Sequence, residues 1–245
     1  PGSVYADLMR DGTLPDPFYR ENELEAFALL EKSFVYQRVF ETEETMLQSH
    51  KVLLRCEGLD TLAHVSLNGQ PVGYADNMHI TWEWDVKLLL LPGENVLEIR
   101  FDSPIRYALN EYEKHPGWYA TDAIPGFQHI RKAHCMFGWD WGPRLPDAGI
   151  WRPISLVCVN EVRLEDALIL QEHEDGKVYL KVTPRVENEP GAAWSWSAAL
   201  ITPEGECRPM DEDGRIVIED PQLWWPAGYG EQPLYEVCVT VNAPD

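Results

Sequence analysis

Apolar and polar residues alternate along much of the chain. The alternation has a period of two and is clearest at four places: Val52/Leu54/Cys56, Ala63/Val65/Leu67, Leu97/Ile99/Phe101 and Val178/Leu180/Val182. Because successive side chains of a β-strand point to opposite faces, each set predicts a strand with one face in a core and the other in water. Asn68-Gly69 follows the second set and predicts a type I′ hairpin, since both turn residues must adopt positive φ.

Helical patterns are scarce and lie early, at residues 4–10 and 21–32. No alternation of strands with ten-residue helices follows, which excludes parallel α/β folds and the eight-fold barrel for this stretch. A chain of many short strands is typical of sandwiches and barrels. We therefore expect an all-β fold.

The chain is expected to form two domains, residues 1–159 and 160–245, because the strand at 154–159 ends there and a more acidic region begins. Five strand candidates follow the boundary: 163–170, 177–186, 194–201, 215–218 and 235–241. Their number suits an immunoglobulin-like sandwich of ~100 residues with one strand unrecognised. Pro1-Gly2-Ser3 reads like the middle of a segment, so a first strand or a signal upstream of Pro1 stays open.

The formal net charge of −21 disfavours binding to nucleic acid or to an anionic membrane surface. Residues 160–245 carry 6 Lys and Arg against 18 Asp and Glu, a balance of −12, which leaves −9 for the residues before them. No apolar run approaches the length of a membrane span, and the start at Pro1 lacks the pattern of a secretory signal. Neutral substrates fit this charge, although an acidic surface also serves solubility alone.

The five cysteines form an odd set with no C-x-x-C spacing and no histidine pair nearby. This pattern predicts neither a disulfide framework nor a zinc site, and nothing else in the sequence indicates a metal or another cofactor. Reduced thiols favour a cytoplasmic location.

The densest segment of the chain is Arg131-Lys-Ala-His-Cys-Met-Phe-Gly-Trp-Asp-Trp-Gly-Pro-Arg144. With Trp151, it places three of the ten tryptophans within thirteen residues. Sugars present apolar C–H faces that stack on indole rings and hydroxyls that need fixed acceptors, so Trp139-Asp140-Trp141 on a glycine-bracketed loop suits a sugar site. Tryptophans that fill a core, with Asp140 capping a turn, are the alternative, and the residues alone leave both open.

The run from Arg131 to Pro153 resembles the signature of β-mannosidases in glycoside hydrolase family 2. Three other blocks resemble the same family: Pro1-Gly-Ser-Val with Leu14-Pro-Asp-Pro-Phe-Tyr-x-x-Asn-Glu23, Leu59-Asp-Thr-Leu-Ala with Leu67-Asn-Gly69, Asp76-Asn-Met78 and Pro92-Gly-Glu-Asn95, and Leu223-Trp-Trp-Pro-Ala-Gly-Tyr-Gly-Glu-Gln-Pro-Leu-Tyr235. Together they cover nearly the whole chain in the family's order. His134-Cys135-Met136 departs from the family's usual residues, and so does the stretch from Glu31 to Tyr36, which keeps a β-galactosidase or β-glucuronidase type open.

The resemblance implies a jelly-roll sugar-binding domain followed by an immunoglobulin-like domain, in an enzyme that hydrolyses terminal β-D-mannosides. Family 2 enzymes are retaining glycosidases with two carboxyl groups ~5 Å apart. The resemblance places both groups on an eight-fold barrel of ~250 residues in the same polypeptide, so none of the catalytic residues is expected in this stretch. The implied partners are a mannoside or manno-oligosaccharide and that barrel.

The motif match makes Asp140 the expected sugar contact, flanked by Trp139 and Trp141, with Asn22 as a weaker candidate. The alternative for Asn22 is a turn-forming residue before a helix. Trp224-Trp225 is expected to form a packed corner between domains rather than a second sugar platform. Two other functions stay open: a free-standing carbohydrate-binding module, since jelly rolls also serve as lectins, and a structural spacer.

Overall fold

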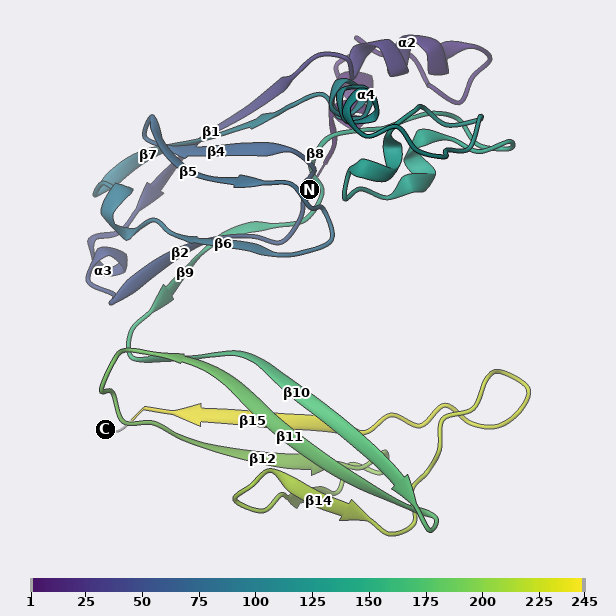
Figure 1. Cartoon of the computed structure of the whole chain (residues 1–245). Coiled ribbons are helices and arrows are strands. Elements are labelled where there is room, and N and C mark those ends of the chain that lie inside the picture. Colours follow the sequence, from purple (N-terminus) through teal and green to yellow (C-terminus); the bar gives the residue numbers. More distant parts are fainter. Residues whose placement is uncertain (1, 244–245) are drawn as a thin grey trace. The chain divides into compact units, whose positions relative to one another are not determined.

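The structure is a computed structural model that describes residues 2–243. It divides the chain into two compact units, Pro1–Cys158 and Val159–Asp245, and each unit is built mainly of β-sheet (Figure 1). The expected fold class is confirmed: the chain is all-β, a jelly-roll sandwich followed by an immunoglobulin-like sandwich. None of the helices in residues 2–243 is long and apolar enough to span a membrane.

One sheet of the first unit has the strand order β1-β7-β4-β5 and is antiparallel throughout. Its strands are β1 (Phe34–Thr42), β7 (Gly93–Phe101), β4 (Ala63–Leu67) and β5 (Gln70–Ala75). The predicted alternation is confirmed in β4 and β7, where every second residue is buried. The predicted hairpin is confirmed as well, since Asn68 and Gly69 join β4 to β5 with φ of 52° and 75°.

The facing sheet has the order β6-β2-β9, and a short two-stranded sheet pairs β3 with β8. The bounds are β6 (Trp82–Asp85), β2 (Lys51–Cys56), β9 (Ile154–Val159), β3 (Leu59–Asp60) and β8 (Gly149–Ile150). Strand β2 exists as predicted, but the expectation of one wet face is wrong for it. Val52, Leu53 and Leu54 are buried in succession, so the outer face of β2 is covered as well.

Figure 1 shows α2 and α4 near one end of the sheets of the first unit and α3 near the opposite end. The helices are α1 (Val4–Arg10), α2 (Asn22–Leu29), α3 (Glu44–Leu47) and α4 (Pro104–Lys114), with 3-10 turns η1 (Lys87–Leu89), η2 (Phe127–His129) and η3 (His134–Phe137). The early helices α1 and α2 are confirmed. The hydroxyl of Ser103 links the end of α2 to the start of α4 by donating to the carbonyl oxygen of Leu30.

The expectation that helices lie only early in the chain is wrong, because α4 is the longest helix of the described residues. Its start carries two ordinary signals. The Ser103 hydroxyl accepts a hydrogen bond from the amide of Arg106 at 3.1 Å, and Pro104 occupies the first turn, where its missing N–H costs nothing. Ile105 and Ala108 then face the core at helical spacing.

The second unit pairs two three-stranded sheets, β10-β11-β14 and β13-β12-β15. The strands are β10 (Val162–Glu174), β11 (Lys177–Asn188), β12 (Ser195–Ile201), β13 (Cys207–Pro209), β14 (Arg215–Ile218) and β15 (Glu236–Asn242). All five predicted strands exist. The unrecognised one is β13, which is three residues long and exposed throughout, so it shows no alternation.

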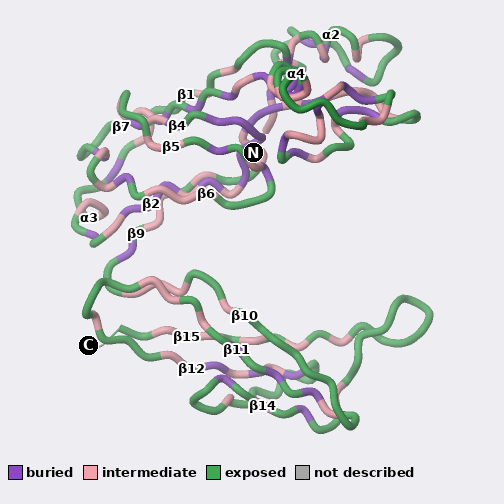
Figure 2. Tube along the Cα trace, in the orientation of Figure 1, coloured by how far each residue is buried: buried purple, intermediate pink, exposed green. Residues whose placement is uncertain are grey.

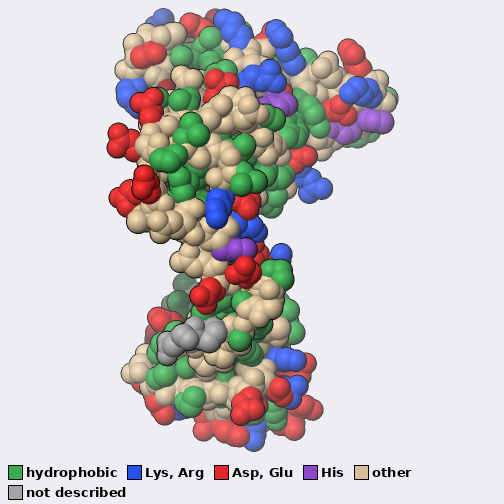
Figure 3. All heavy atoms as spheres, turned by 90° about the vertical axis from the view of Figure 1, so that its left-hand side faces the viewer, with side chains coloured by type: hydrophobic (Ala, Val, Ile, Leu, Met, Phe, Trp, Pro, Cys, Tyr) green, Lys and Arg blue, Asp and Glu red, His purple; other side chains and the backbone are tan. Residues whose placement is uncertain are grey.

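The core of the second unit is small. It centres on Val178, Leu180, Leu200 and Ile218, and Figure 2 shows that the buried positions lie mainly along β11, β12 and β14. All five cysteines are free thiols, with Cys56 buried and the other four exposed. Acidic side chains are spread over the face of each unit that Figure 3 presents.

Asn95 is fully buried and joins three backbone segments of the first unit. Its amide nitrogen donates to Thr42 Oγ1 at 3.0 Å and to the carbonyl oxygens of Leu91 and Gly93 at 2.8 and 2.9 Å. Its Oδ1 accepts from the Asn68 side chain at 2.8 Å and from the Leu91 amide at 2.9 Å. A single side chain therefore provides hydrogen-bond partners for polar groups of the turn before β7 and of the hairpin between β4 and β5.

We expect Asn95→Ala to lower the free energy of unfolding by about 2–3 kcal/mol, because the part-buried donors of Asn68 and Leu91 and the buried Thr42 hydroxyl lose their partner. Urea unfolding of the whole chain measures the change in the transition of the first unit. Gln70→Ala is the matched control, since Gln70 lies exposed at the same hairpin and its loss should cost about 0.5 kcal/mol or less. Equal effects of the two variants would show that the buried network contributes nothing.

Candidate functional site

Trp139, Asp140 and Trp141 lie on a tight turn of the first unit. The amide of Trp139 donates to the carbonyl oxygen of Gly142 and the amide of Gly142 to that of Trp139, both at 3.2 Å. Asp140 and Trp141 are therefore the central residues of the turn, and both are exposed. Core packing, the alternative reading of this motif, does not hold for Trp139 and Trp141, which are 52% and 81% exposed.

The two indoles next to Asp140 in the sequence form an open pair. Their ring centroids are 5.5 Å apart and the ring planes are inclined by 52°. Aromatic rings that are not face to face leave ring surface free for another group to stack on. The turn thus presents apolar ring faces and an anionic acceptor together, the combination that a sugar ring requires.

A cleft of about 580 Å³ lies at this turn. Residues 139–144 line one side, and two segments distant in sequence complete it: 17–23, which contributes Phe18, Arg20 and Glu23, and 121–122, which ends in Asp122. Three carboxylates and two arginines thus reach the cleft with the indole pair. Such a lining offers several fixed hydrogen-bond acceptors and donors to a polyhydroxylated ligand.

Arg144 joins two of these segments. Its Nε donates to Glu23 Oε1 at 3.3 Å, and its guanidinium lies 5.5 Å from the ring centroid of Phe27 on the same helix. An ion pair that is stacked on an aromatic ring holds both of its partners in place better than an exposed pair alone. The structure therefore brings together the two segments in which sugar contacts were predicted.

Gly138 lets residues 121–122, the third segment of the cleft, approach the loop that carries Asp140. It has φ of 101°, in the region that favours glycine, and a Cβ there would lie 2.5 Å from Arg144 Cγ and 3.0 Å from the carbonyl oxygen of Asp122. Glu23, Asp122 and Arg144 were not recognised as cleft residues from the sequence. Arg144 and Glu23 carried a signal, since each lies in a block that resembles the family, whereas Asp122 carried none.

Asn22 is placed differently from the other candidates. It is the first residue of α2, and its side-chain amide donates to the carbonyl oxygen of Asp16 at 2.8 Å. It does not line the cleft, whereas its neighbours Arg20 and Glu23 do. A sugar contact by Asn22 stays a prediction, and the geometry gives its side chain a turn-forming role.

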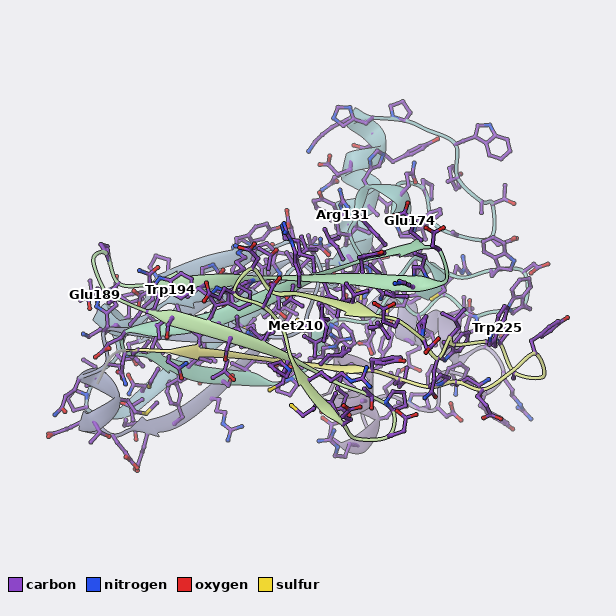
Figure 4. The ribbon with its side chains drawn as sticks, turned by 90° about the horizontal axis from the view of Figure 1, so that it is seen from below. Arg131, Glu174, Glu189, Trp194, Met210 and Trp225 are labelled. Carbon is purple, nitrogen blue, oxygen red and sulfur yellow. The ribbon has the colours of Figure 1, made fainter. Side chains whose placement is uncertain are left out.

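Trp224 and Trp225 belong to the second unit and are 56% and 49% exposed. Trp225 packs over Gly230, where a Cβ would lie 2.7 Å from the indole, and its amide donates to the carbonyl oxygen of Glu231. Figure 4 shows Trp225 at the end of this unit opposite Glu189 and Trp194. About half of each residue is exposed, and a packed corner between domains stays a prediction. Within residues 2–243, no group of His, Cys, Asp and Glu is arranged to hold a metal ion.

The sequence of the first unit matches a known protein family. The family model described as "Glycosyl hydrolase 2 galactose-binding domain-like" matches residues 1–152. The chain belongs to this family. Glycosyl hydrolase 2 membership confirms the family recognised in the sequence, and the match includes every residue that lines the cleft.

Relatives and solved structures agree with the family. The chain is 34% identical to "Beta-mannosidase B" of Emericella nidulans and 29% identical to "Beta-mannosidase" of Capra hircus, over 99% and 98% of its length. It matches the crystal structure of "Beta-D-Mannosidase from Dictyoglomus thermophilum" with a TM-score of 0.85, 33% identity and 99% coverage. An "Uncultured Clostridium sp. Beta-glucuronidase", at 18% identity and a TM-score of 0.59, shares the fold. The chain spans 30% of the length of both curated relatives.

We expect Gly138→Ala to destabilise the first unit by about 1–3 kcal/mol, because the new Cβ overlaps Arg144 and the positive φ disfavours alanine. Gly142→Ala is the matched control on the same turn. A Cβ at Gly142 would meet nothing closer than the Trp139 amide nitrogen at 4.0 Å, so we expect a cost of about 1 kcal/mol or less. Thermal unfolding measures both, and equal costs would contradict the role given to Gly138.

Proposed function

We propose that this chain is the sugar-positioning, non-catalytic portion of a retaining β-mannosidase-like glycoside hydrolase. The intact polypeptide hydrolyses terminal β-D-mannosides. Residues 1–159 form the jelly-roll sugar-binding domain and residues 160–245 the immunoglobulin-like domain. The observation that carries the proposal is the exposed Asp140, flanked in sequence by two exposed tryptophans, at a cleft built from three segments of one unit.

Asp140 acts by holding the sugar. An ionised carboxylate accepts two hydrogen bonds from hydroxyls, and bonds between a charged and a neutral group are stronger than neutral ones. Trp139 and Trp141 flank the ring, and Asn22 is a weaker contact. Contacts remote from the cleaved bond accelerate the reaction by fixing the ring in a reactive orientation.

Hydrolysis itself belongs to another part of the polypeptide. A retaining glycosidase needs two carboxyl groups ~5 Å apart, one as acid and base and one as nucleophile. We place both on an eight-fold barrel, a fold of ~250 residues for which the relatives have ample length. This chain alone is therefore expected to be inactive.

The degree of sequence identity to known enzymes favours mannosides over other substrates. The β-mannosidases are 29–34% identical to the chain, against 18% for the β-glucuronidase that shares its fold. A β-galactosidase or β-glucuronidase type is the runner-up. The four exposed free thiols suit a reducing compartment, and we propose the cytoplasm.

In the whole polypeptide that contains this chain, we expect Asp140→Ala to lower kcat/KM for p-nitrophenyl β-D-mannoside about a hundredfold, which corresponds to about 2.7 kcal/mol of transition-state stabilisation. The fold should not change, because Asp140 is exposed on a turn. Glu212→Ala is the control for loss of one exposed turn carboxylate elsewhere. Turnover like that of the wild type in the Asp140 variant would remove Asp140 from the site.

The chain by itself is expected to bind mannose and manno-oligosaccharides only weakly. Asp140 and its indoles contact one side of a sugar, and a ligand that is half enclosed buries too little surface to offset the entropy lost on binding. Isothermal titration calorimetry of the 245-residue chain measures this. Micromolar affinity would instead identify a self-sufficient carbohydrate-binding module.

A further inference from the structure

A buried ion pair lies at the base of the loop that carries the Asp140 turn. The side chain of Lys132 is 0% exposed, and its Nζ donates to Asp60 Oδ2 and, at 2.6 Å, to the carbonyl oxygen of Asp147. The carboxylate of Asp60 is 5% exposed and also accepts a hydrogen bond from the Thr61 hydroxyl. This ammonium is far from solvent, so it cannot itself contact a substrate.

The ammonium of Lys132 ties the two ends of one long loop to each other and to a neighbouring strand. Residues 132–147 leave the sandwich at Lys132 and return to it at Asp147, and the Trp139-Asp140-Trp141 turn lies midway between them. Asp60 belongs to β3, where it pairs with Gly149 of β8. Lys132 therefore bonds both ends of the loop to the edge of the same small sheet.

Between this base and the turn, few hydrogen bonds join the two arms of the loop, residues 133–138 and 143–146. The Leu145 amide donates to the carbonyl oxygen of Met136 at 2.8 Å, and the Trp139 and Gly142 backbones close the turn. On the outer side, the carbonyl oxygen of Arg131 accepts from the Met78 amide at 3.0 Å. The base at Lys132 thus determines where the arms start and in which direction they project.

We propose that Lys132 is a positioning residue for Asp140: by bonding Asp60 and Asp147 together, it fixes both ends of the loop that carries the sugar-binding carboxylate. The functional part of this inference rests on the function proposed above. The structural part, that the pair anchors the loop, stands on the buried geometry alone.

Stability alone is a poor explanation for the pair. Burial lowers the pKa of Lys132 although the Asp60 carboxylate opposes this, because desolvation disfavours the charged ammonium. Replacing a buried ion pair by neutral groups of similar size often leaves a protein equally stable, whereas removing one partner is costly. The pair instead fixes the position of the loop ends, since an ammonium bonded to two oxygen atoms holds both at fixed distances.

The test separates anchoring from stability by removing both charges at once. In the double variant Lys132→Met with Asp60→Asn, neither member of the pair is left as an unpaired charge, and the amide that replaces the Asp60 carboxylate still offers its oxygen to Thr61. The nearby Asp147 carboxylate keeps its hydrogen bonds from the amides of Tyr5 and Ala148. We expect unfolding like that of the wild type, but amide hydrogen exchange at residues 133–147 accelerated about tenfold or more through local opening. Lys132→Met alone leaves Asp60 unpaired and should also destabilise the first unit.

Arg55→Met is the matched control. It breaks the ion pair of Arg55 with Glu83, 2.7 Å apart between β2 and β6 of the same unit, and should leave exchange at 133–147 unchanged. Unchanged exchange in the double variant would overturn the anchoring role, whatever its activity.

The link to Asp140 is tested in the whole polypeptide with p-nitrophenyl β-D-mannoside. We expect the double variant to lower kcat/KM about tenfold, and to lower it little further when Asp140→Ala is already present, because residues that act through one another are not additive. Fully additive losses would overturn the positioning role. A harmless Asp140→Ala would overturn the proposed function instead, and the exchange result would still decide on the anchoring.

Discussion

The close approach of the Gly138 backbone to the carbonyl oxygen of Asp122 and to the side chain of Arg144 is the constraint on which the site depends. No side chain fits there, because the carbonyl oxygen of Asp122 and the stem of Arg144 already occupy the space. Arg144 can then reach Glu23, 121 residues earlier in the chain, and the cleft closes on its third side. A glycine in a left-handed conformation thus converts a tryptophan-rich loop into a lined cleft.

The sandwich and the loops contribute different things to this arrangement. Strands with alternating apolar and polar residues bury Val65, Leu67 and Ile99 in a rigid core, which gives the loops a fixed base. The loops carry the groups that reach solvent, since a buried loop would leave backbone polar groups without partners. Asn95 and Lys132 stand at the transition, where buried hydrogen bonds fasten irregular backbone to regular sheet.

Local patterns predicted the sheet elements well and the cleft poorly, for one physical reason. The hairpin at Asn68-Gly69 and the strands β4 and β7 depend on neighbours in sequence, so their signals lie in adjacent residues. Strand β13 is short and exposed, so it has no alternation to read. The pairing of Arg144 with Glu23 and of Lys132 with Asp60 spans 121 and 72 residues, and periodicity carries no information at such separations.

Helix α4 is a different case, because its signals were present. Ser103-Pro104 is a typical helix start, and Ile105 and Ala108 continue at helical spacing. The same chemistry explains why the helix matters for the site. Gly126, which precedes η2, lies against the carbonyl oxygen of Ala108, so α4 supports the backbone that leads through η2 and η3 to Gly138. A helix that touches no ligand thereby helps to determine where the Asp140 carboxylate stands.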